Sequence, residues 1–234
     1  MADVIDFCEC STKMPLIGDK APKFTANTTN GPIDFPDDFA GKWIVLFSHP
    51  SDFTPVCTTE FIAFQRDMAG FQELNTQLIG LSVGALSSHL AWFDAIARMP
   101  DGVNISFPVI DDLRMDVAKL YGMFHPKASD TSAIRAVFII DTAGIIRAIL
   151  YYPPNLGRNI TEIQRILVGL QTADAFKVAM PANWMPGDSV LTPAPTTSAA
   201  IYKHHKDTPW FLTYKNLSEG TIYAKITNKK TTKK

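Results

Sequence analysis

Cysteine is scarce in this chain, and its scarcity argues against one class of protein. Three cysteines, Cys8, Cys10 and Cys57, occur in 234 residues. Small secreted proteins that are held together by disulfides have many cysteines for their length, in an even number, and this chain has neither feature. Cys8 and Cys10 supply at most two metal ligands without a second pair nearby, so we expect no zinc site and no other bound metal.

Long apolar runs and a strong net charge are also missing. No stretch approaches the roughly 18 uninterrupted apolar residues of a membrane-spanning helix, and the first residues lack the basic and apolar segments of a secretory signal. The formal net charge of −1 favours neither nucleic acid nor a membrane as a partner. Lysines gather in residues 225–234, which we interpret as a solvated basic tail. We therefore expect a cytoplasmic protein without nucleic-acid or membrane partners.

Apolar and aromatic residues, in contrast, are plentiful. Hydrophobic residues make up 46% of the chain, which includes 15 phenylalanines and 4 tryptophans, enough for a sizeable core. Apolar runs at 43–47, 78–83 and 136–140 predict buried strands, and apolar residues spaced by three and four predict helices between them. Strands that alternate with helices predict an α/β fold with a central mixed β-sheet flanked by helices.

Polar residues mark where two of these helices begin. Ser87 or Ser88 can cap the helix that follows the strand at 78–83. Asn159, with Glu162 three residues later, has the spacing of a capping box. We therefore predict helices that start at these two places.

Cys57 lies where a predicted strand gives way to a predicted helix. Apolar residues spaced by three and four continue from Phe61 to Leu74, which predicts one helix with a single buried stripe. Cys57 then falls in or just before the first turn, which Thr58 or Thr59 can cap. Unpaired backbone N–H groups at that end favour a thiolate, the reactive form of the side chain. By position alone, a small buried cysteine beneath a helix is an equal alternative.

The residues around Cys57 resemble a known active-site sequence. They read His49-Pro-Ser-Asp-Phe-Thr-Pro-Val-Cys-Thr-Thr-Glu60. The pattern Pro50-x-x-x-Thr54-x-x-Cys57 within this stretch resembles the active site of the peroxiredoxins, and the longer stretch resembles their one-cysteine subfamily. The resemblance implies a thioredoxin-like core and a thiol-specific peroxidase without a cofactor, which reduces hydrogen peroxide and organic hydroperoxides to water and alcohols.

The same resemblance implies a role for each residue of the site. Cys57 would attack a peroxide oxygen and become a sulfenic acid, while Thr54 would hold the peroxide. Arg135, directly before the strand at 136–140, would stabilise the thiolate and the charge on the leaving oxygen. Pro50 would shield the sulfur from solvent. The expected supporting residues are His49, Glu60 and Arg158.

The chain departs from some of these relatives in one sequence element. Some one-cysteine peroxiredoxins carry a Gly-Asp-Ser-Trp-Gly element tied to lipase activity, whereas residues 40–44 here read Ala-Gly-Lys-Trp-Ile. Because the serine is missing, we do not expect that activity.

Since no cysteine follows Cys57, we expect an external thiol of the thioredoxin, glutathione or another type to reduce the sulfenic acid. Condensation of the sulfenic acid with Cys8 or Cys10 is the alternative.

The resemblance also predicts how the chain is divided. We expect a leader over 1–17, a thioredoxin-like peroxiredoxin domain over 18–172, a small C-terminal extension over 173–224 and the basic tail over 225–234. The extension has aromatic residues that need a covering surface, from the same subunit or from a partner, and we expect it to make the contacts of a homodimer or of a higher oligomer.

Two other functions compete with a thiol peroxidase. A chaperone-like or scaffolding oligomer with secondary redox activity would not need an intact peroxidase motif, yet Thr54 and Arg135 are both present. A thiol–disulfide oxidoreductase on the same fold normally uses Cys-x-x-Cys, and Glu60 stands where the second cysteine would be. We therefore expect peroxide reduction to be the main activity.

Overall fold

The computed structural model divides the chain into two compact units. It describes residues 14–129, 131–204 and 209–227. The first unit contains the chain up to Gln65 together with residues 77–158, and the second contains residues 66–76 and the chain from Asn159 onward. Cys8, Cys10 and most of the lysine-rich tail lie outside the described residues. None of the described helices is both long enough and apolar enough to cross a membrane.

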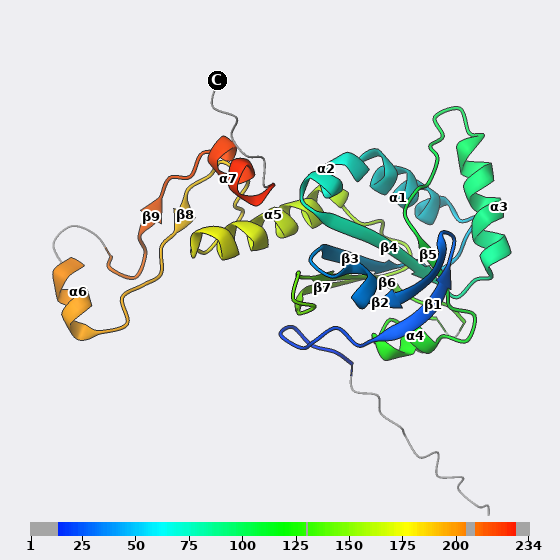
Figure 1. The fold of residues 1–234 in the computed structure, drawn as a ribbon, viewed down its shortest axis with the longest axis horizontal. Helices are drawn as coiled ribbons and strands as arrows, with labels where there is room; N and C mark the ends of the chain where they lie inside the picture. The colour runs from blue at the N-terminus through cyan, green and yellow to red at the C-terminus, as the bar shows by residue number, and fades with distance from the viewer. Residues whose placement is uncertain (1–13, 130, 205–208, 228–234) are drawn as a thin grey trace, which may run out of the picture. The chain divides into compact units, whose positions relative to one another are not determined.

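A seven-stranded sheet forms the centre of the first unit, in the order β2-β1-β5-β4-β3-β6-β7 (Figure 1). Its strands are β1 Phe24–Thr28, β2 Gly31–Phe35, β3 Trp43–Ser48, β4 Thr76–Ser82, β5 Val109–Asp111, β6 Arg135–Ile140 and β7 Ile146–Tyr152. β4 and β5 are parallel, whereas β1 with β2, β3 with β6 and β6 with β7 are antiparallel. This arrangement confirms the predicted central mixed sheet.

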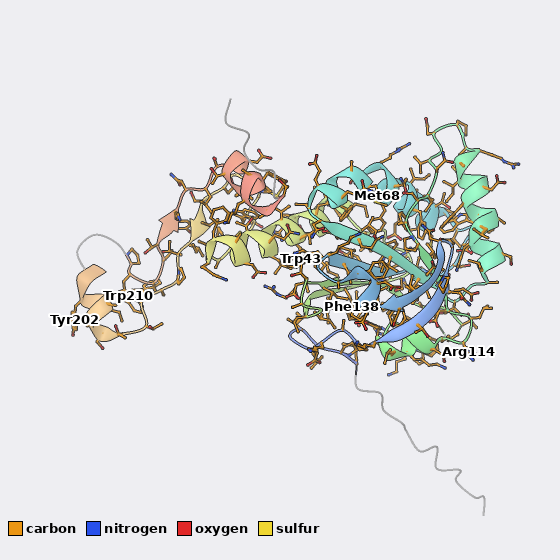
Figure 2. The ribbon with its side chains drawn as sticks, viewed as in Figure 1. Trp43, Met68, Arg114, Phe138, Tyr202 and Trp210 are labelled. Carbon is orange, nitrogen blue, oxygen red and sulfur yellow. The ribbon has the colours of Figure 1, made fainter. Side chains whose placement is uncertain are left out.

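The central strands explain why the apolar runs are unbroken in the sequence. Every residue of β3 and β6 is buried, because a strand that is covered on both faces needs apolar side chains at successive positions. Figure 2 labels Trp43 of β3 and Phe138 of β6 among the core side chains. Phe47 of β3 stacks on Phe64 with ring centroids 4.3 Å apart. The end of β3 is therefore rigid where the loop toward Cys57 begins.

Helices complete the first unit, and two of them pack directly on each other. They are α1 Pro55–Arg66, α3 Leu86–Ala97, α4 Asp116–Leu120 and the 3-10 helix η1 Asp37–Phe39. The rings of Phe61 on α1 and Trp92 on α3 lie 4.6 Å apart, and Trp92 Nε1 donates a hydrogen bond to Thr58 Oγ1 over 3.3 Å. The helix that carries Cys57 is therefore braced by α3.

The second unit contains one long helix and a set of short C-terminal elements. Its elements are α2 Met68–Glu73, α5 Ile160–Phe176, β8 Val190–Leu191, α6 Ser198–His204, β9 Tyr214–Lys215 and α7 Glu219–Ile226. β8 and β9 pair as an antiparallel ribbon. Phe211 and Tyr214 are 64% and 56% exposed, and Tyr202 on α6 is 76% exposed (Figure 2). This exposed aromatic surface lies in the predicted extension.

The predicted helix from Phe61 to Leu74 is wrong in one respect, because it is two helices. α1 ends at Arg66 and α2 starts at Met68. Asp67 between them has φ −90° and ψ 5°, outside the α region. Its carbonyl then accepts hydrogen bonds from the N–H groups of Gly70 and Phe71, which start the second helix.

The predicted cap of α1 is also wrong. Pro55 opens the helix, a position that suits its fixed φ and its missing N–H. Thr58 and Thr59 lie inside α1, where their hydroxyls donate to the carbonyls of Thr54 and Val56 over 2.8 Å each. The two threonines therefore back-bond within the helix and do not satisfy its first N–H groups.

The other two cap predictions have opposite outcomes. Asn159 caps α5 as predicted, because its Oδ1 accepts a hydrogen bond from Glu162 N over 3.2 Å. α3 begins after Ala85, which makes no side-chain cap bond, so neither Ser87 nor Ser88 is its cap. The hydroxyl of Ser88 has a different partner, described below.

Candidate active site

Cys57 is fully buried at the third position of α1, beside a permanent positive charge. Arg135, the first residue of β6, donates from Nη1 to Cys57 Sγ over 3.3 Å. A guanidinium stays protonated at every pH at which proteins fold. A charged donor next to the sulfur favours the thiolate over the neutral thiol.

Arg135 is fixed along both edges of its guanidinium group. Nε and Nη2 donate to the carbonyl oxygen of Pro154 over 3.1 and 2.9 Å, and Nη1 donates to Glu60 Oε2 over 2.6 Å as well as to the sulfur. The planar fork therefore meets three acceptors at once, which the single nitrogen of a lysine could not do in the same geometry. Its aim at Cys57 is preset before any substrate arrives.

Glu60, one helical turn after Cys57, holds two arginines in place. Its side chain is 2% exposed. Arg158 donates to Oε1 from its backbone N and from Nε, both over 2.8 Å, and to Oε2 from Nη2 over 2.7 Å. Burial raises the pKa of Glu60, but the charge and hydrogen bonds of Arg158, together with the charge of Arg135, outweigh burial and lower it. Glu60 is therefore ionised at neutral pH.

The buried side chains beside the sulfur carry one excess positive charge. Arg135 and Arg158 carry two positive charges, and Glu60 carries one negative charge. An uncompensated charge is costly in a buried site, so this group attracts a negative charge beside Cys57.

Arg158 is held so firmly that it acts as part of the scaffold. Its Nη1 donates to the carbonyl oxygens of Ser48 and Ala136 over 2.8 and 3.1 Å. Its guanidinium carbon lies 5.1 Å from the ring centroid of Phe47 and 5.6 Å from that of Phe64. Arg158 thus ties Glu60 to the ends of β3 and β6.

The loop before α1 is more exposed than the sulfur. Thr54 and Pro50 are partly exposed, and Phe53 between them is 59% exposed with φ 54°. Left-handed backbone is unusual for a phenylalanine and indicates a tightly constrained turn. Thr54 Oγ1 donates to the carbonyl of Ser51 over 2.9 Å, which leaves its lone pairs able to accept a hydrogen bond from a substrate.

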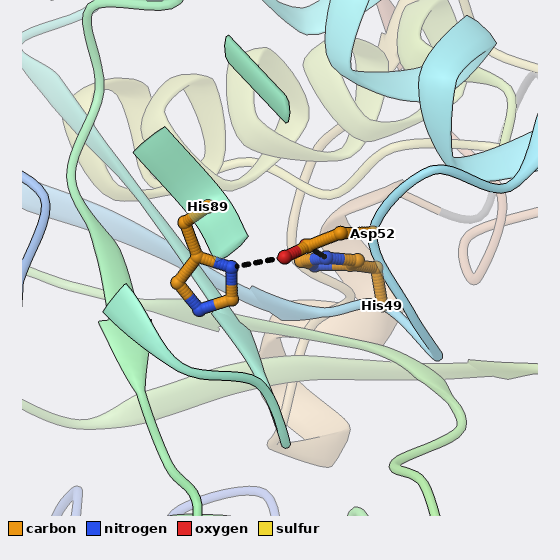
Figure 3. A group of neighbouring side chains, drawn as sticks. All are labelled: His49, Asp52 and His89. Atoms are coloured by element: carbon orange, nitrogen blue, oxygen red, sulfur yellow. Dashed lines mark hydrogen bonds and ion pairs between the residues drawn. The ribbon is translucent and has the colours of Figure 1, made fainter. Parts of the chain in front are cut away.

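His49 joins a second buried group in the same loop (Figure 3). Its Nε2 is 2.9 Å from Asp52 Oδ1, and His89 Nδ1 is 2.7 Å from Asp52 Oδ2. Ser88 Oγ donates to the same Oδ2 over 2.7 Å. Burial lowers the pKa of His49 although Asp52 opposes that shift. Burial raises the pKa of Asp52, but the bonds from His49, His89 and Ser88 lower it well below its usual range.

These three side chains are also of types that bind metal ions. Among the described residues, ligand atoms of His49, Asp52 and His89 lie within 4.8 Å of one another. Within the described residues, one nitrogen of each histidine and both carboxylate oxygens of Asp52 already bond to one another. We therefore interpret the group as a hydrogen-bonded network.

Comparison with known proteins identifies the same regions of the chain. The model of the AhpC/TSA family matches residues 17–149, and that of the C-terminal domain of 1-Cys peroxiredoxin matches residues 169–205. A peroxiredoxin of Methanosarcina mazei is 57% identical over 193 residues, which cover 80% of this chain and 88% of that protein. The chain belongs to the peroxiredoxin family.

Solved peroxiredoxin structures have the same fold. A yeast mitochondrial 1-Cys peroxiredoxin aligns with a TM-score of 0.76 and 37% identity, covering 87% of this chain and 100% of that one. A cysteine-to-serine mutant of peroxiredoxin 6 from Arenicola marina aligns with a TM-score of 0.76 and 32% identity, covering 87% and 97%. The predicted thioredoxin-like core with a C-terminal extension and the one-cysteine subfamily are confirmed. The protein is accordingly a thiol-dependent peroxidase.

The peroxiredoxin structure joins some of the predicted site residues and keeps others apart. Cys57, Glu60, Arg135 and Arg158 form one connected set of bonds. Within the described part of the chain, the side-chain hydrogen bonds of Thr54 and His49 go to Ser51 and Asp52 and not to the sulfur. Pro50 flanks the site in the loop after β3.

Two groups that shape this peroxiredoxin site escaped the sequence reasoning. The carbonyl of Pro154 fixes Arg135, and a backbone acceptor leaves no side-chain signal in a sequence. His89 looks like one more residue of an amphipathic helix, since its partner Asp52 lies on a different segment. A signal did exist for Asp52, which stands inside the recognised stretch from His49 to Glu60.

Proposed function

We propose that Cys57 is the thiolate that reacts with peroxide. The observation that carries this proposal is the 3.3 Å contact between Arg135 Nη1 and Cys57 Sγ. The sulfur attacks one peroxide oxygen, the O–O bond breaks, and the cysteine becomes a sulfenic acid. The other oxygen takes up a proton and leaves as water or, from an organic hydroperoxide, as an alcohol.

The neighbouring residues have distinct roles in this proposal. Arg135 stabilises both the thiolate and the charge that moves onto the leaving oxygen. Thr54 accepts a hydrogen bond from the peroxide, and Pro50 limits the access of water. Glu60 and Arg158 hold Arg135 in register, and His49 supports the loop. These assignments rest on geometry and on the match to the family's motif.

The second half of the cycle is proposed to use an external thiol. The yeast mitochondrial relative was solved in a study of its thiol-resolving mechanism through glutathione and thioredoxin systems, which supports a reductant of that class here. Peptide mass mapping after one equivalent of peroxide tests this. A sulfenic acid on Cys57 with free thiols at Cys8 and Cys10 is expected, whereas a dominant disulfide between Cys57 and either would contradict it.

Assembly, domain division and location complete the proposal. The exposed aromatic side chains of the extension over 173–224 support a homodimer in which this segment makes contacts. We also propose that the leader, the thioredoxin-like domain and the extension end at residues 17, 172 and 224. The proposed location is the cytoplasm. Sedimentation of the wild-type protein and of a variant with Phe211→Ser and Tyr214→Ser tests the assembly, because a monomeric wild type would contradict it.

Stopped-flow measurement of peroxide consumption tests the function. Cys57→Ser should abolish the reaction with the fold retained, because an alcohol is hardly ionised at neutral pH. The matched control replaces Cys8 and Cys10 with serine and should react with peroxide as fast as the wild type in the first step. If this control were as slow as Cys57→Ser, the assignment of Cys57 would be wrong.

A further inference from the structure

Asp52 and His89 are buried and have no role in the reaction as described above. We propose that Asp52 and His89 are positioning residues, which hold the turn from Ser51 to Thr54 so that the Thr54 hydroxyl meets the peroxide. The inference rests on the proposed peroxide-binding role of Thr54. It gives a catalytic purpose to two side chains that touch neither the sulfur nor its arginine.

The side chain of Asp52 is anchored to α3. Its Oδ2 accepts a hydrogen bond from His89 Nδ1 over 2.7 Å (Figure 3). It also accepts one from Ser88 Oγ over 2.7 Å, and Ser88 precedes His89 on α3. The start of α3 is itself tied to the end of β5, since Leu86 N donates to Asp111 Oδ2 over 3.3 Å. Asp52 is therefore fastened to a fixed part of the fold.

Two hydrogen bonds link Asp52 to Thr54 through Ser51. Ser51 Oγ donates to the carbonyl of Asp52 over 3.2 Å, and Thr54 Oγ1 donates to the carbonyl of Ser51 over 2.9 Å. Phe53 has a left-handed φ of 54°, so the turn persists only while its surroundings hold it. Freeing the Asp52 side chain would let the turn relax and would move the acceptor that orients the Thr54 hydroxyl.

The two histidines bond to Asp52 through one nitrogen each. His49 Nδ1 and His89 Nε2 are buried and have no hydrogen-bond partner among the described residues. Each ring therefore makes its hydrogen bond through the nitrogen that faces Asp52, and in the neutral form that nitrogen carries the hydrogen. Both rings are fully buried, and His49 is clamped between Phe61 and Trp92 at centroid distances of 4.7 and 5.3 Å. The carboxylate thus has donors on both oxygens and little freedom to rotate.

No hydrogen bond between described residues joins the network to the guanidinium of Arg135, which donates to Pro154, Glu60 and Cys57. Burial lowers the pKa of His49, and the charge of Arg158, which adds to that shift, is the link between the two groups. A defect at His89 should consequently slow the reaction with peroxide and leave the thiolate intact. A merely structural role would weaken both together.

Two substitutions of His89 provide the first test. His89→Leu removes the donor, whereas His89→Asn can present an amide N–H close to the place of Nδ1. The rate constant with hydrogen peroxide should fall between about tenfold and a hundredfold in the leucine variant and recover most of that loss in the asparagine variant. Alkylation of Cys57 by iodoacetamide, which needs the thiolate but no peroxide site, should stay within about twofold of wild type in both.

A milder pair of variants covers the case in which His89→Leu does not fold. Ser88→Ala removes one donor to Asp52 at a partly exposed position, and its matched control is Ser87→Ala on the exposed side of the same helix. The Ser88 variant should lower the ratio of the peroxide rate to the alkylation rate, and the Ser87 variant should leave that ratio unchanged. The inference would be overturned if the ratio of the peroxide rate to the alkylation rate in His89→Leu and Ser88→Ala equalled that of Ser87→Ala and the wild type. It would also be overturned if the peroxide rate and the alkylation rate fell by the same factor in His89→Leu or Ser88→Ala.

A double-variant cycle tests whether His89 acts through Thr54. If it does, adding His89→Leu, or Ser88→Ala in its place, to Thr54→Val should slow the reaction little beyond Thr54→Val alone. Independent, multiplying losses would show that the network does not work by positioning Thr54. A wild-type enzyme that is alkylated at Cys57 but does not consume peroxide would instead refute the proposed function itself.

Discussion

Replacing Arg135 with alanine should slow the reaction of Cys57 with peroxide by about three orders of magnitude. A hydrogen bond to a charged group contributes about 1.5–3 kcal/mol, and we take the lower end because Nη1 is shared between the sulfur and Glu60. At about 1.4 kcal/mol for each factor of ten, the thiolate loses roughly tenfold in stability. Loss of a donor to the leaving oxygen adds about a hundredfold.

The fold should tolerate this change because the other partners of Arg135 remain satisfied. Glu60 keeps Arg158 on both of its oxygens, and Pro154 is exposed, so its carbonyl can bond to water. Arg135→Lys should recover only part of the rate, since one ammonium cannot reach Pro154, Glu60 and the sulfur together. Circular dichroism checks the fold of each variant.

The assay is stopped-flow oxidation of Cys57, combined with the ultraviolet absorbance of the thiolate. Arg147→Ala is the matched control, because Arg147 on β7 also pairs with a carboxylate, Asp141, at the far end of the β6–β7 hairpin. Its rate should equal that of the wild type. An Arg135→Ala rate within about threefold of wild type, with unchanged thiolate absorbance, would refute the reasoning.

Three further predictions concern stability and substrate binding. Glu60→Gln should destabilise the fold by about 3–5 kcal/mol in urea titration, because it removes the buried carboxylate that pairs with both Arg135 and Arg158. Glu162→Gln at a partly exposed pair should cost less than about 1 kcal/mol. The pKa of His49 in the folded protein lies below its ordinary 6.5, so the contribution of neutral His49 to stability is complete above pH 6.5 and is lost as the pH falls. His49→Gln should therefore reduce the change of the urea midpoint with pH below 6.5. A midpoint that changes with pH as in the wild type would contradict this. Thr54→Val should slow peroxide reduction at least tenfold at constant thiolate absorbance and Thr54→Ser should not, while equal rates in the two would remove the hydroxyl from the mechanism.

The sequence was sufficient for the central strands and for the family to which the chain belongs. The buried strands β3 and β6 are visible in the sequence as unbroken apolar runs. Asn159 and Glu162 mark the start of α5 because the capping hydrogen bond joins residues only three positions apart. Local signals failed where tertiary partners competed for the same side chain. Serine is a common helix cap, but the hydroxyl of Ser88 donates its hydrogen bond to Asp52 Oδ2.

The pairing inside the site could not be predicted because it joins distant segments. The sequence marks Glu60 only as a supporting residue, whereas its partners in the structure are side chains from two other segments, Arg135 and Arg158. The sequence placed each arginine near the site only through resemblance to a family. That one carboxylate bridges both, and that one positive charge remains beside Cys57, depends on distances that appear only in the folded chain.

The complete burial of Cys57 imposes an order on the molecules that can react with it. The sulfur of Cys57 has no exposed surface. A peroxide is a small molecule, but a protein thiol that forms a disulfide must bring its Cα atom within about 7 Å of that of Cys57. The first turn of α1, closed by the hydrogen bond from Thr58 N to Thr54 O over 3.0 Å, must therefore open before a protein reductant can enter. We therefore expect reduction of Cys57 by a protein thiol to depend on how often this turn opens. A longer-lived sulfenic acid would leave more time for further oxidation to sulfinic acid, so a variant with a more stable first turn should be oxidised further at a given peroxide concentration.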